Sequence, residues 1–133
     1  MMKLAQVKEI LKARTLGQFE DPEQHFLFGF GADLMSDVLA FISEGCLLLT
    51  GLATEQVIRT AEIVDVKAII FVRGKNPPPN IIKLANEKNI TLLSTDCTMY
   101  LACGMLYSGG LPGYVVSRDK NSGDFKVHGG GSI

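Results

Sequence analysis

Residues 46–51 read Cys-Leu-Leu-Leu-Thr-Gly, a short apolar run that ends in two small residues. Such a run is typical of a strand that is buried on both faces of a sheet. Residues 53–64 follow, and their apolar side chains recur at the spacing of an amphipathic helix. A second apolar run comes next, at residues 68–72. This alternation predicts the strands of a parallel sheet joined by covering helices.

The same rhythm continues on both sides of this centre. Further strands are predicted within residues 25–30 and 90–93, and further helices at residues 3–13, 34–43, 77–87 and 96–107. We therefore expect an α/β domain of three layers, with a mainly parallel sheet of four or five strands and helices on both faces. Residues 1–111 are assigned to this domain. For the glycine-rich tail, residues 112–133, two alternatives stay open: a hairpin around residues 121–123, or an unstructured segment.

Composition excludes several classes of protein. The chain has 133 residues, 47% of them hydrophobic and 20% charged, which suits one domain with a real core. A net charge of −1 gives no basic field for the phosphates of a nucleic acid. The longest apolar run, residues 99–107, is far shorter than the roughly 20 residues of a membrane span. Three cysteines cannot all pair, so we expect reduced thiols in the cytoplasm.

The candidate ligand site comes from the ends of the predicted strands. In an open parallel sheet, ligands bind beyond the carboxyl ends of the strands. Three loops lie there: Thr50-Gly51, Arg73-Gly74-Lys75 and Ser94-Thr95-Asp96. With the positive ends of the helices that follow, they suit a small anionic ligand. Each loop also has a structural alternative: a simple turn, a solvated rim and a helix cap, respectively.

Motifs for catalysis or cofactor binding are absent. The glycine at position 74 is not part of a phosphate-binding loop, because position 69 is Ile, and no Gly-x-Ser-x-Gly elbow occurs. The two histidines, His25 and His128, have no cysteine at ligand spacing. Apart from the thiol of Cys97, no His or Cys lies near the predicted edge. We predict no metal, no cofactor and no catalysis.

The last predicted helix is apolar nearly all round. A helix that covers one face of a sheet needs a single apolar stripe, so a second contact surface is indicated. Burial under the tail hairpin is one alternative. We expect the other, a homodimer interface, formed by Met99, Tyr100, Leu101 and Met105.

Residues 33–40 (Asp-Leu-Met-Ser-Asp-Val-Leu-Ala), 45–51, 68–74 and 93–96 follow one another in the order and spacing of the DRTGG domain family, which this chain resembles over residues 33–111. The Asp, Arg and Thr of the signature that names the family are absent. Their place reads Leu-Phe-Gly-Phe-Gly, at residues 27–31.

Members of this family are accessory domains beside CBS modules and phosphate acetyltransferases, and are similar in fold to the N-terminal domain of HPr kinase/phosphorylase. The resemblance implies a regulatory or dimerising role. We predict a stand-alone bacterial module that binds a small anionic metabolite or nucleotide; the alternative is a docking subunit for a partner kinase or oxidoreductase, with no small ligand. The predicted ligand-binding residues are Asp33, Ser36, Asp37, Thr50, Gly51, Arg73, Gly74, Thr95 and Asp96.

Overall fold

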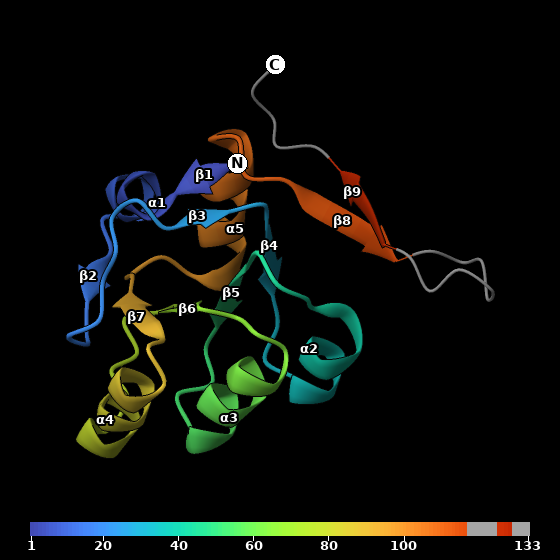
Figure 1. Cartoon of the computed structure of the whole chain (residues 1–133). Helices are drawn as coiled ribbons and strands as arrows, with labels where there is room; N and C mark the ends of the chain where they lie inside the picture. Colours follow the sequence, from blue (N-terminus) through green and yellow to red (C-terminus); the bar gives the residue numbers. More distant parts are fainter. Residues whose placement is uncertain (117–124, 129–133) are drawn as a thin grey trace.

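A five-stranded sheet forms the middle layer of the protein, in the order β2-β7-β6-β5-β4 (Figure 1). The computed structural model describes residues 1–116 and the backbone of residues 125–128. Strands β4 to β7 run parallel, and β2 is antiparallel to β7. The five strands are β2 (Arg14–Thr15), β4 (Phe28–Gly31), β5 (Cys46–Thr50), β6 (Ala68–Phe71) and β7 (Thr91–Ser94).

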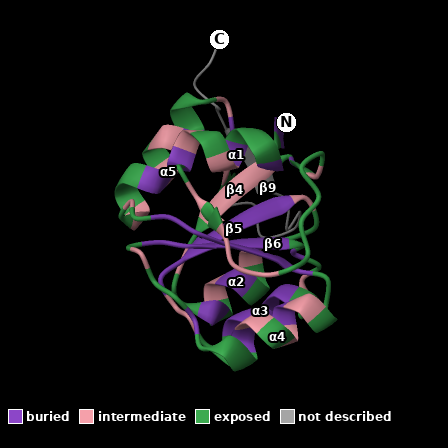
Figure 2. Ribbon diagram, turned by 90° about the vertical axis from the view of Figure 1, so that its left-hand side faces the viewer, coloured by how far each residue is buried: buried purple, intermediate pink, exposed green. Residues whose placement is uncertain are grey.

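Helices cover both faces of this sheet (Figure 2). Helices α1 (Leu4–Leu11) and α5 (Met99–Ser108) lie on one face. The other face carries α2 (Met35–Phe41), α3 (Glu55–Ile63) and α4 (Pro79–Glu87). Each helix begins and ends within three residues of its predicted range. The predicted three-layer α/β fold is confirmed.

The apolar strands supply two cores at once. Leu47 and Leu49 of β5 pack with α1 and α5, whereas Leu48 between them packs with α2 and α3. In β6, Ile69 and Ile70 divide in the same way. Successive side chains of a strand point to opposite faces, so an unbroken apolar run is what a doubly covered strand requires.

Three short strands depart from the predicted pattern. The apolar segment 25–30 contains two strands, β3 (His25–Phe26) and β4, because the chain turns at Leu27, whose amide donates to the carbonyl of Gly45. Strand β3 pairs with β1 (Met2–Lys3), outside the main sheet. Strands β1 and β2 have two residues each and carry no periodicity that a sequence could reveal.

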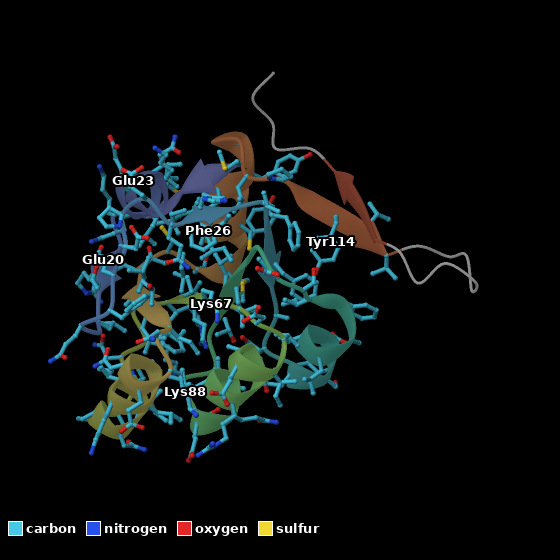
Figure 3. All side chains as sticks on the ribbon, viewed as in Figure 1. Glu20, Glu23, Phe26, Lys67, Lys88 and Tyr114 are labelled. Atoms are coloured by element: carbon cyan, nitrogen blue, oxygen red, sulfur yellow. The ribbon has the colours of Figure 1, made fainter. Side chains whose placement is uncertain are left out.

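The tail contains two paired strands that extend away from the body of the protein (Figure 1). Strand β8 (Gly113–Val116) runs antiparallel to β9 (Phe125–His128). The turn predicted at residues 121–123 lies outside the described residues. Tyr114, labelled in Figure 3, attaches β8 to the body: its ring stacks on Phe30, and its hydroxyl donates to the carbonyl of Phe41. The domain boundary at residue 111 stays a prediction.

Candidate functional site

The loops after β5, β6 and β7 meet at one edge of the sheet. The amide of Val72 donates to the carbonyl of Thr50, at 3.0 Å, and the amide of Gly74 donates to the carbonyl of Thr95, at 2.8 Å. We call this edge, residues 50–52, 73–75 and 94–97, the rim. The three predicted loops therefore do lie side by side, as parallel strand order requires. Their role in ligand binding stays a prediction.

Asp33, which lies just before α2, is hydrogen-bonded to the end of β5. Its Oδ1 accepts hydrogen bonds from the Thr50 hydroxyl, at 2.9 Å, and from the Gly51 amide, at 2.7 Å. The Thr50 hydroxyl accepts in turn from the amide of Leu52. The N-cap of α2 is Leu34, without a side-chain cap bond. Neither Asp33 nor Ser36 caps this helix, and the Asp33 carboxylate is engaged with the neighbouring strand instead.

Thr95 has a similar internal role on the other side of the rim. Its buried hydroxyl donates to the carbonyl of Leu11 at the end of α1, at 2.8 Å, and accepts from the amide of Cys97. The hydroxyls of both Thr50 and Thr95 are thus bonded within the protein, and both side chains are fully buried. In this structure they hold the rim together and present no group to solvent.

Arg73 is the exposed cation at the middle of the rim. Its backbone has a φ of +61°, and that of Gly74 has a φ of +66°, so the chain turns sharply after β6. The guanidinium lies against Gly51: a Cβ on that glycine would be 2.5 Å from Nη2 of Arg73. Any side chain at position 51 would displace the guanidinium. None of the ion pairs formed by the described residues includes Arg73.

Asp96 and Ser94 are engaged by a residue that the sequence did not reveal. Arg14 of β2 places Nη1 at 3.3 Å from Oδ1 of Asp96 and donates from Nη2 to the hydroxyl of Ser94. Both members of the ion pair are exposed, so it contributes little stability. Arg14 was missed because β2 is too short to be predicted. With Arg73 and Lys75, it makes three cations at the rim.

The remaining predicted ligand residues lie on α2. Ser36 is exposed, and Asp37 is half-buried in the first turn of the helix. None of the side-chain hydrogen bonds described joins either residue to the rim.

The N-termini of the helices that follow the rim were expected to add partial positive charge there, and α3 and α4 differ from this expectation. Helix α3 begins with Glu55, which opposes an anion. Helix α4 has Pro78 as its N-cap and Pro79 as its first residue, and neither has an amide hydrogen to donate. Helix α5 has no acidic residue in its first turn.

A separate apolar groove of about 1150 Å³ runs along α5, between this helix, β4 and residues 111–114. Tyr100 is 90% exposed and Leu101 is 51% exposed, whereas Met99 and Met105 are half-buried against the core. Burial raises the pKa of the Cys103 thiol in this groove, which keeps the thiol protonated and poorly nucleophilic. Strand β8 forms one wall of the groove and leaves Tyr100 uncovered.

The thiol of Cys97 at the rim and the imidazole of His25 lie at opposite edges of the sheet. The sulfur of Cys97 lies 4.0 Å from that of Met105. His25 lines a small cleft with Glu44 and Lys67, at the opposite edge, where β5 and β6 begin. No cluster of three or more His, Cys, Asp or Glu within the described residues is arranged to hold a metal ion. None of the helices in residues 1–116 combines the length and apolar character that a membrane crossing requires.

Comparison with known proteins identifies a matching family and a solved structure of similar fold. The model of the DRTGG domain matches residues 6–108. A solved structure of the CBS and DRTGG domains of the regulatory region of Clostridium perfringens pyrophosphatase, complexed with its activator diadenosine tetraphosphate, is similar with a TM-score of 0.64 and 23% identity. The similarity covers 78% of this chain and 45% of that chain, so the present chain spans less than half of it. No curated protein matches.

Proposed function

Because the chain belongs to the DRTGG domain family, we propose that it is a regulatory module that binds a small anionic metabolite or nucleotide at the rim, without catalysis of its own. The observation that carries this proposal is the exposed guanidinium of Arg73, which is held against Gly51 and has no carboxylate partner among the described ion pairs. A guanidinium binds phosphate and carboxylate groups through paired, charge-assisted hydrogen bonds.

Two acidic side chains, one at the rim and one bonded to it, favour a nucleotide over a simple anion. Asp33 and Asp96 are exposed, and each has a carboxylate oxygen that can accept a further hydrogen bond. Sugar hydroxyls and base amino groups are donors, so a nucleotide would use the cations and the carboxylates together. The similar pyrophosphatase region is complexed with such a compound, diadenosine tetraphosphate.

Each rim residue then has a separate role. Arg73 contacts the phosphate, and Lys75 adds a second positive charge beside it. Gly51 provides the space for the guanidinium, and Asp33 positions Gly51. Because Asp33 also leads into α2, a ligand that prefers one position of this loop shifts the protein toward that conformation by its differential affinity. Its three free cysteines support a cytoplasmic location, where thiols stay reduced.

A thermal-shift screen with nucleotides, including diadenosine tetraphosphate, and with acyl phosphates tests this function. A ligand at a hundredfold excess over its Kd should stabilise the fold by about 2.7 kcal/mol. If no compound raises the melting midpoint while a co-purified protein does, the docking-subunit alternative replaces the ligand-binding one. The exposed apolar face of α5 is the observation that favours that alternative.

We also propose that the chain is a homodimer through α5, and Leu101→Glu should dissociate it. A buried carboxylate at an apolar interface is strongly unfavourable. Light scattering should give twice the 14.4 kDa chain mass for the wild type and the single mass for the variant. Ile63→Glu, an equally drastic change at an exposed position of α3, is the control and should remain dimeric. A wild-type monomer at micromolar concentration would contradict the proposal.

A further inference from the structure

Gly104 is a glycine that the fold of one chain does not explain. It lies in the middle of α5, where glycine is among the least favourable residues. A Cβ at this position would meet no atom of the described residues within 4 Å. Other glycines differ: a Cβ on Gly31 would lie 2.8 Å from the sulfur of Met99, and one on Gly29 would lie 2.9 Å from Leu111. Those two are small because α5 and Leu111 approach them, whereas Gly104 faces open space.

The side chains around Gly104 form a saddle on the outer face of α5. Tyr100 is four residues before it, and Tyr107, which is 37% exposed, is three residues after it. Residues at these spacings share one side of a helix. Gly104 therefore lies between two tyrosines on the exposed side of the helix.

The saddle and the groove beside it carry no charge. Helix α5 contains no Asp, Glu, Lys or Arg, and neither do the other residues that line the groove. A charged partner would find no complementary charge here. A second copy of the same face meets it without like-charge repulsion, and a two-fold axis brings the same patch of both chains together.

We propose that α5 of a second copy crosses α5 at Gly104, with the two-fold axis at this residue. The missing side chain allows the two helices to approach closely at the crossing. Where the helices cross in opposite directions, Tyr100 of one copy packs beside Tyr107 of the other. This inference rests on the dimeric assembly proposed above and is independent of the ligand at the rim.

Gly104→Leu tests the crossing. The leucine has room in a single chain and favours the helix, so the variant should fold. Its melting midpoint should be no lower than that of the wild type measured at a concentration where the wild type is monomeric. Its dimer dissociation constant, measured by sedimentation over a dilution series, should rise at least tenfold. Ala40→Leu, at an exposed position of α2, is the control and should leave the constant unchanged.

Gly104→Cys gives a second, positive readout. Two cysteines at a close crossing fall within the Cα separation of a disulfide, roughly 4.4–6.8 Å, so mild oxidation should link the chains. Ala40→Cys should give no linked dimer. A wild-type dimer that Gly104→Leu does not weaken, or equal linking of both cysteine variants, would overturn the crossing and leave the dimer in place. A wild-type monomer would overturn both, and neither result bears on binding at the rim.

Discussion

Arg73→Ala should weaken binding of a phosphate-bearing ligand by about tenfold to a hundredfold, because a hydrogen bond to a charged group contributes about 1.5–3 kcal/mol. The stability of the fold should hardly change. The guanidinium is exposed and belongs to none of the described ion pairs, and alanine meets the same backbone strain at a φ of +61° as arginine does. Titration calorimetry gives the affinity, and thermal unfolding gives the stability.

Lys67→Ala is the matched control for this change. It also removes one exposed positive charge, but Lys67 precedes β6 and so lies at the opposite edge of the sheet. A loss of binding in both variants would mean that overall charge, and not contact with Arg73, attracts the ligand. Unchanged affinity in Arg73→Ala would place the ligand elsewhere.

Thr95→Val should lower the free energy of unfolding by at least ~2 kcal/mol and leave ligand affinity unchanged. Valine has nearly the same shape, but without the hydroxyl the Leu11 carbonyl and the Cys97 amide both lose a buried partner, and each loss costs roughly 1–3 kcal/mol. Urea or thermal unfolding measures the change. The midpoint of thermal unfolding should fall by several degrees.

Thr98→Val is the control for the loss of a hydroxyl. Thr98 is the exposed N-cap of α5, and its side chain makes no cap bond, so its replacement should change stability by less than about 0.5 kcal/mol. The opposite pattern for Thr95→Val, with normal stability and lost affinity, would make Thr95 the ligand contact that the sequence alone suggested.

The sequence predicts the layers of this fold because burial on two faces leaves a pattern. Residues 46–49 are apolar without a break, since alternate side chains enter different cores. Strand β2 leaves no such pattern. Its two residues pair with β7 only in the folded chain, and so Arg14 could not be placed at the rim.

The sequence predicts where the candidate site lies, but not which of its side chains are hydrogen-bonded within the protein. Strand ends locate Thr50, Arg73 and Thr95 at one edge, because parallel strands share their carboxyl ends. Which hydroxyl is bonded internally depends on partners that are distant in sequence: Asp33 lies 17 residues from Thr50, and Leu11 lies 84 residues from Thr95. No local pattern encodes those distances.

The last helix shows the same limit. An apolar character on all sides predicts a second surface for α5. Only the packing of the folded chain shows that Met99 and Met105 are half-buried while Tyr100 stays exposed. The open position beside Gly104 likewise depends on what surrounds it in space.

Nuclear magnetic resonance on the ¹⁵N-labelled chain, during a titration with diadenosine tetraphosphate, shows whether an anionic ligand binds at the rim. The amide signals of Gly51, Arg73 and Gly74 should shift first and most, because Gly51 lies against the guanidinium and the other two amides belong to Arg73 itself and to the next residue. Shifts confined to the α5 groove, or no shifts at millimolar ligand, would contradict binding at the rim.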